Sequence, residues 1–162
     1  MSSVGFGLSY SEFKFAWTNA NPPAAVVAVL DSPDDSSGHR EVTMNHSVTV
    51  TNVGGRVSDV VALAFAVAVT GSAPDTPLRK LFGFERFAAV KPGESRTAFF
   101  ESTTDVLGVV GRDGAKWLHP GHRLRIECGS VAGHKVAQEL TLVGLTAPVL
   151  VERNEWALRG GR

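Results

Sequence analysis

The stretch Val42-Thr-Met-Asn-His-Ser-Val-Thr-Val-Thr51 alternates, almost residue by residue, between apolar and polar side chains. Successive side chains of a β-strand point to opposite faces of a sheet, so this alternation is typical of a strand with one buried face. Asn52-Val-Gly-Gly55 follows and supplies residues that tolerate the positive φ of a turn. The sequence therefore predicts a half-buried strand that ends in a tight turn.

The next segment, Val57 to Thr70, is apolar at odd and even positions alike. The odd positions carry bulk, and the even ones from 62 to 68 are all alanine; the bulky residues are Val61, Leu63, Phe65, Val67 and Val69. We expect one face to fill the core while the other lies under something close, which indicates a central strand. The apolar run from 60 to 69 is much shorter than the about 20 residues that a membrane-spanning helix needs, so no membrane association is expected.

Shorter strands follow, separated by turn residues. Turns are expected at Lys91-Pro-Gly-Glu94, Asp113-Gly114 and Pro120-Gly121. The strands are expected over residues 81–87, 96–101, 115–119, 124–128 and 136–142, and residues 105–110 fit either a helical turn or a strand. Seven or eight short strands without a convincing amphipathic helix predict an all-β fold, an antiparallel β-sandwich.

Composition limits the partners. The length of 162 residues is expected to form one domain. Lysine and arginine (16) balance aspartate and glutamate (16), so no nucleic-acid partner is expected. Cys128 is the only cysteine, which excludes an intrachain disulfide. The first five residues lack the basic and apolar regions of a secretory signal, and the compartment stays open.

No motif for catalysis, a cofactor or a metal stands out. The carboxylates form no recognisable pair of the kind that hydrolyses glycosides, and His119 with His122 lacks a third metal ligand nearby. The acidic loop Asp31–Gly38 does not have the alternating acids of a calcium loop. His46 and Cys128 lie on the apolar phases of their strands. Cys128 is expected in the core, and His46 is expected to be hydrogen-bonded and partly buried. Asn45-His-Ser47 is a formal glycosylation sequon, which matters only in a secreted protein.

Five motifs occur in a specific order along residues 5–143. They are Gly7-Leu-Ser-Tyr-Ser-Glu-Phe13, Val48-Thr-Val-Thr-Asn-Val-Gly54, Lys80-Leu-Phe-Gly-Phe-Glu-Arg-Phe87, Lys91-Pro-Gly-Glu-Ser95 and Trp117-Leu-His-Pro-Gly121. Together they resemble the C-terminal fibronectin type III-like domain of glycoside hydrolase family 3, the β-glucosidase and β-xylosidase family. The chain departs from that pattern at His122, where the family often has an aromatic residue, in its alanine-rich central strand, and in the loop 31–38, which resembles an insertion.

The resemblance implies an immunoglobulin/fibronectin type III-like sandwich that acts as a non-catalytic accessory domain. The family's catalytic carboxylates lie on a preceding barrel and α/β domain, so the implied partners are those catalytic domains. The implied layout is a linker over residues 1–12, the sandwich over 13–145 and a strap or tail over 146–162. We expect the first apolar side chains to pack on a neighbouring domain: Phe6, Leu8, Tyr10 and Phe13.

A second hypothesis is a stand-alone β-sandwich that binds carbohydrate or protein. Several aromatic side chains on a flat face stack on sugar rings, and Trp117 is the candidate for such a contact. An independent enzyme is the least supported class.

Overall fold

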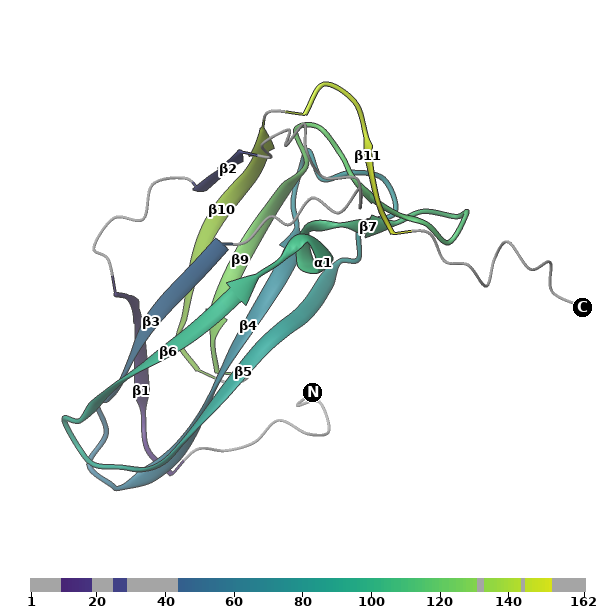
Figure 1. Ribbon diagram of the computed structural model, residues 1–162. Coiled ribbons are helices and arrows are strands. Elements are labelled where there is room, and N and C mark those ends of the chain that lie inside the picture. Colours follow the sequence, from purple (N-terminus) through teal and green to yellow (C-terminus); the bar gives the residue numbers. More distant parts are fainter. Residues whose placement is uncertain (1–9, 19–24, 29–43, 131–132, 144, 153–162) are drawn as a thin grey trace, which may run out of the picture.

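Eleven strands and one short helix make up the residues that the computed structural model describes, which are 10–18, 25–28, 44–130, 133–143 and 145–152. Two main sheets face each other, and a small third sheet lies at one end (Figure 1). The three-stranded sheet has the order β1 (Phe13–Trp17), β3 (Met44–Asn52) and β6 (Ser95–Ser102). The five-stranded sheet has the order β2 (Ala25–Ala28), β10 (Lys135–Val143), β9 (Arg123–Gly129), β4 (Ser58–Ala68) and β5 (Arg79–Val90). The predicted all-β sandwich is confirmed.

The small sheet has the order β11 (Val149–Glu152), β8 (Lys116–Leu118) and β7 (Val109–Val110). Helix α1 (Thr104–Leu107) precedes it, so residues 105–110 contain both of the alternatives expected there. Strand β11 comes from the segment expected to be a strap, and it pairs with β8. No helix in the described part of the chain is long and apolar enough to cross a bilayer.

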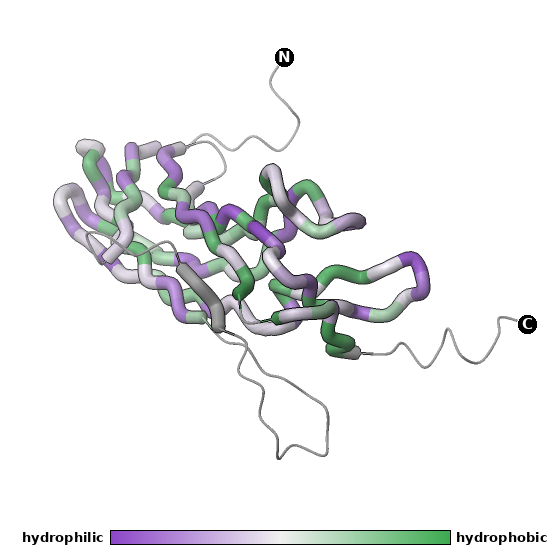
Figure 2. Tube along the Cα trace, turned by 90° about the horizontal axis from the view of Figure 1, so that it is seen from above, coloured by the Kyte–Doolittle hydropathy of each residue, from purple (hydrophilic) through white to green (hydrophobic). Residues whose placement is uncertain are grey.

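Strand β3 has the expected alternation. Its inward side chains His46, Val48, Val50 and Asn52 are all buried. Figure 2 shows the same alternation of hydrophilic and hydrophobic positions along the strands. The pairs β1–β3 and β3–β6 are antiparallel. The parallel pairing of β2 with β10 was not expected, because the apolar residues of β2 have no period-two pattern.

Strand β4 is apolar on both faces, and the small side chains are the ones that point inward. The inward residues are Ala62, Ala64 and Ala66, and the outward residues are Val61, Leu63, Phe65 and Val67. Large rings from the opposite sheet, Phe15 and Phe100, fill the core beside the alanines, as close packing requires. One face of β4 therefore fills the core as expected. The other face is only partly covered by the described residues: Val61 is 39% exposed, and Leu63 and Phe65 are half-buried.

Strand β5 contains a bulge next to its glycine, Gly83. The register shifts between the pairs Ala64–Gly83 and Phe65–Leu81, which leaves Phe82 as the extra residue. A Cβ atom at Gly83 would lie 2.7 Å from the ring of Phe100. The absence of a side chain there lets the two sheets approach.

Two contacts close the open sides of the sandwich. On one side, the amide of Phe15 in β1 donates to Nδ1 of His134 (3.3 Å), and the indole of Trp17 donates to the carbonyl of Ala137 (3.4 Å). On the other, the amide of Phe99 in β6 donates to the carboxylate of Glu85 in β5 (3.1 Å). The two main sheets are therefore tied along both edges.

Candidate functional site

The described residues of four of the five sequence motifs lie at or lead into two opposite ends of the sandwich, and the fifth motif, residues 80–87, lies along β5 (Figure 1). At the end where β1 begins, which we call the joint end, residues 11–12 are hydrogen-bonded to the β3–β4 turn, and Asn52 is hydrogen-bonded to the β5–β6 turn. At the other end, which we call the distal end, the β4–β5 loop meets the turn before β9. Each end is organised by one buried polar side chain.

Asn52 organises the joint end. Its side chain is fully buried, and its Nδ2 donates to the carbonyls of Arg56 (2.7 Å) and Val90 (2.9 Å). Its Oδ1 accepts from the hydroxyl of Ser11 (2.7 Å) and from the amide of Gly54 (3.0 Å). The side chain thereby connects the start of the described chain, the β3–β4 turn and the end of β5. We call these five residues the joint cluster.

The backbone repeats this connection. The carbonyl of Glu12 accepts from the amides of Val53 (2.9 Å) and Gly54 (3.1 Å). A Cβ atom at Gly54 would overlap the hydroxyl of Ser11 and lie 2.6 Å from the amide nitrogen of Glu12. Only glycine fits there without displacing the incoming segment, so the segment at residues 11–12 is held against the sandwich.

Of the four side chains expected to pack on a neighbouring domain, the structure describes two, and one is exposed while the other is buried. Tyr10 is 83% exposed beside the joint cluster. Phe13 is buried in the core of this domain, so its expected role in a domain interface is corrected: as the first residue of β1 it points inward. Phe6 and Leu8 lie outside the described residues.

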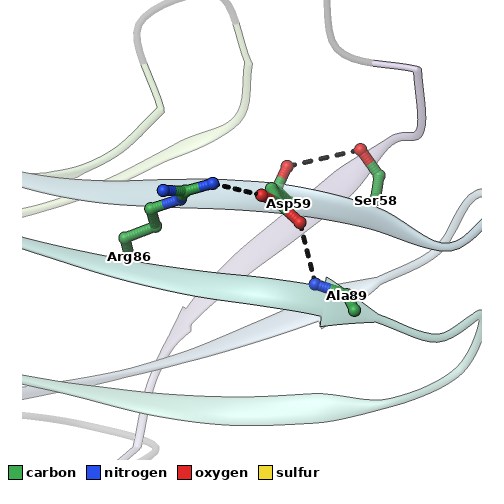
Figure 3. A network of polar contacts seen from close by, with 4 residues as sticks. All are labelled: Ser58, Asp59, Arg86 and Ala89. Atoms are coloured by element: carbon green, nitrogen blue, oxygen red, sulfur yellow. Dashed lines mark hydrogen bonds and ion pairs between the residues drawn. The ribbon is translucent and has the colours of Figure 1, made fainter.

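An exposed polar network supports the end of β5 near the joint (Figure 3). Asp59 accepts from the amide of Ala89 (2.8 Å) and from Nη2 of Arg86 (2.6 Å), and the hydroxyl of Ser58 donates to the Asp59 carbonyl (3.3 Å). The backbone hydrogen bond from Ala89, followed by that from Arg86, lowers the pKa of Asp59. Ala89 has a φ of 52°, an unfavourable value for alanine. The carboxylate therefore holds a strained bulge of β5 in place.

His122 organises the distal end. Its Nδ1 accepts from the amide of Ala73 in the β4–β5 loop (2.9 Å), and its carbonyl accepts from the amide of Leu142 (2.9 Å). The ring is 1% exposed, and burial, with a smaller contribution from the charge of His119, lowers its pKa to about 4. His122 is thus a neutral structural residue. No group of three potential metal ligands occurs among the described residues.

Trp117 lies on the small sheet and is half-buried. Its indole nitrogen donates to the carboxylate of Asp113 in the β7–β8 turn (3.3 Å). The other residues of β7, β8 and β11 are not aromatic. The flat face of several aromatic rings that sugar stacking requires is therefore not formed around Trp117 in this small sheet.

The remaining candidate reactive groups are in the core. Nε2 of His46 bonds to the hydroxyl of Ser102 (2.9 Å), and burial lowers the pKa of His46 to about 4. Burial raises the pKa of the Cys128 thiol to about 12, so the thiol is inert. Cys128 is in the core as expected, and His46 is hydrogen-bonded as expected but more fully buried than expected. In the described part of the chain, the buried polar side chains hold loops and turns together by hydrogen bonds and form no reactive centre.

Sequence reasoning noticed Asn52 only as a turn residue. Its place in the alternation indicates a larger role: Asn52 continues the inward-facing series of Val48 and Val50, so a polar amide is buried at that position. Asp59 was missed entirely, since an exposed carboxylate near a strand end has no distinguishing pattern.

Comparison with known proteins agrees with this geometry. Residues 60–132 match the family model of the fibronectin type III-like domain. An exo-1,4-β-xylosidase of Emericella nidulans is 36% identical over 118 residues, which cover 72% of this chain and 15% of that protein. A probable exo-1,4-β-xylosidase of Aspergillus fumigatus is 32% identical over 128 residues, or 77% of this chain and 17% of that protein. The chain therefore spans less than a fifth of these relatives.

Solved structures share the fold. A family 3 exo-β-xylosidase has a TM-score of 0.72 at 24% identity, with 94% of this chain and 19% of that one covered. A β-glucosidase of Listeria innocua has a TM-score of 0.66 at 24% identity, with 86% and 17% covered. Residues 60–132 thus match the fibronectin type III-like domain, and most of the chain is similar in sequence to one region of these exo-1,4-β-xylosidases and in fold to one region of the solved glycosidases.

Proposed function

We propose that this chain is a non-catalytic accessory domain of a β-glucosidase-like glycoside hydrolase. In this proposal the parent protein hydrolyses O-glycosidic bonds, and the domain braces its catalytic barrel and α/β domains. The support comes from relatives named exo-1,4-β-xylosidases, in which the region similar to this chain is a minor part of the length. The two ends of the sandwich are also organised by buried, hydrogen-bonded side chains, Asn52 and His122, rather than by a pair of carboxylates.

The joint cluster is the observation that carries the bracing role. A brace transmits orientation only if the connection to its neighbour is stiff. The hydroxyl of Ser11 and the carbonyl of Glu12 are both hydrogen-bonded to the β3–β4 turn. A domain that precedes residue 10 would therefore be attached to a fixed base, and Tyr10 would be available to pack on it.

The first test is the gene. Its reading frame, or an adjacent one, should encode a barrel and an α/β domain upstream of the Met1 codon. The purified 162-residue chain should not hydrolyse nitrophenyl β-glucoside or β-xyloside. With the upstream region present, the catalytic part should melt at a temperature higher by about 5 °C or more than without this chain. Absence of an upstream catalytic region, or hydrolysis by the chain alone, would refute the proposal.

The alternative of a stand-alone carbohydrate-binding module has weaker support. Trp117 is half-buried, and its indole hydrogen bond goes to Asp113 of the same domain. Titration of the isolated chain with xylan and glucan oligosaccharides tests this alternative. Saturable binding that Trp117→Ala abolishes without unfolding would favour it over the accessory role.

A further inference from the structure

The outward face of β4 has the composition of a surface that is covered in the assembled protein. Strands buried on both faces are near-continuous apolar runs, whereas a strand with one wet face alternates apolar and polar residues. Strand β4 is apolar from Val60 to Ala68, yet only its alanine face is fully buried: on the outward face Val61 is 39% exposed, and the other large side chains are half-buried. The larger side chains are the ones left outside. Burial of one face alone does not explain this arrangement.

Strand β5 extends the apolar surface. Leu63 lies directly opposite Phe84, and Phe65 lies opposite Leu81 across the β4–β5 pair. Phe84 is 72% exposed and Leu81 is 49% exposed. We call these residues, together with the neighbouring valine, the outer patch: Val61, Leu63, Phe65, Leu81 and Phe84. An apolar patch with a polar rim is typical of an interaction surface.

Arginines border the outer patch. The guanidinium of Arg79 lies 3.7 Å from the ring centre of Phe65. Arg79 and Arg125 both pair with Glu127, at 3.5 Å and 3.0 Å, so one carboxylate serves two guanidinium groups. Arg86 pairs with Asp59. The rim thus has three arginines against two carboxylates, a net charge of +1, and guanidinium groups have donors to spare for further acceptors.

The outer face of the three-stranded sheet is different. Its hydroxyl groups bond to one another across strands, Thr51 to Ser95 (2.8 Å) and Thr18 to Thr49 (3.3 Å). Phe99 is the exposed large apolar residue there, at 72%. This hydroxyl-rich face is typical of a surface exposed to solvent, whereas the outer patch is typical of a surface that contacts another protein domain.

We infer that the outer patch is the surface on which the catalytic part of the parent protein packs. The matching surface of the catalytic part would be apolar at its centre, and carboxylates around that centre would pair with the arginine rim of this chain. This inference rests on the proposed function. The relatives contain roughly five times as much further chain as the region they share with this one, which supplies a neighbour of sufficient size. A second copy of this chain fits less well, because it would bring a rim of the same net positive charge.

Thiol labelling tests this placement. The only native cysteine, Cys128, is buried, so a cysteine introduced on the surface reports on its own site. Phe84→Cys places a thiol in the outer patch, and Phe99→Cys places one on the hydroxyl-rich face. The two phenylalanines are equally exposed, at 72%, which makes Phe99→Cys the matched control. The rate of maleimide labelling at each site is measured by mass spectrometry, for the 162-residue chain alone and for the chain together with its upstream catalytic region.

The expected result is a rate at position 84 that falls by about tenfold or more when the catalytic region is present, while the rate at position 99 changes by less than about twofold. Equal protection of both sites, or of position 99 alone, would overturn the placement but leave the accessory role intact. Slow labelling of position 84 in the isolated chain would also overturn the placement. If that protection increased with protein concentration, a second copy of the chain would cover the outer patch; if it did not, a segment of the same chain would cover it. If the wild-type chain does not associate with any upstream region, both proposals fail.

Discussion

The two ends of the sandwich solve the same problem with different chemistry. At the joint end a neutral amide, Asn52, holds three segments together, and at the distal end an imidazole, His122, holds a loop to a turn. Both side chains are buried and hydrogen-bonded. An amide does not titrate, whereas a histidine does. The joint end is therefore insensitive to mild acid through its organising residue, and the distal end is not.

The largest effect is expected from Asn52→Ala. The substitution leaves the buried carbonyl of Val90 without its donor and removes the bonds to Ser11 and Gly54. The free energy of unfolding should fall by about 3–4 kcal/mol, because each unsatisfied buried group costs about 1–3 kcal/mol. Urea denaturation measures this. Asn45→Ala on the exposed face of the same strand should change it by less than about 0.5 kcal/mol, and equal losses in both would contradict the role of the joint cluster.

Acid separates the two ends more directly. The pKa values of His122 and His46 are both lowered to about 4 by burial, below the about 6.5 of an unfolded histidine. The unfolded state therefore binds more protons between pH 6.5 and pH 4. The free energy of unfolding is highest above pH 6.5 and falls as the pH is lowered to about 4. Below that pH the loss levels off, and it amounts to up to about 3 kcal/mol for each histidine.

Variants assign this loss to a position. His122→Asn keeps a hydrogen-bond acceptor near the place of Nδ1 but does not titrate, so its stability should decline less between pH 6.5 and pH 4 than that of the wild type. Urea denaturation at a series of pH values gives the slopes. An unchanged slope in His122→Asn would show that the distal end does not sense acid through this ring.

The period of a strand is visible in its sequence, but its partners are not. The alternation in residues 44–51 predicted β3 and its buried face, including His46. For β4 the sequence indicated a central strand and left open which face was inside, because both faces are apolar. The orientation depends on Phe15 and Phe100, whose rings arrive from the other sheet. The role of Asn52 was equally hidden, since its bond to Val90 spans 38 residues.

The glycines of the β3–β4 turn provide a test of the joint alone. Gly54→Ala introduces a Cβ against Ser11 and Glu12, while Gly55→Ala adds one where no atom lies within 4 Å. We expect Gly54→Ala to lower the free energy of unfolding by about 2 kcal/mol and to speed hydrogen exchange at residues 11–12. Gly55→Ala should be nearly neutral. If the two variants behave alike, close approach at Gly54 is not what fixes the incoming segment.

The smallest effect compares one strained residue at each end. Ala89 near the joint has a φ of 52°, and Asp75 in the distal β4–β5 loop has a φ of 59°. Left-handed backbone costs an alanine about 1 kcal/mol, whereas aspartate tolerates it better. Ala89→Gly should therefore stabilise the domain by up to about 1 kcal/mol, and Asp75→Gly should stabilise it by less. Asp75→Gly also removes the ion pair with Arg112, but this pair is long and exposed, so its loss changes the stability little. Thermal unfolding of both variants measures the difference. A larger gain at Asp75 would mean that the hydrogen bond from the Ala89 amide to Asp59 already relieves the strain at the joint end.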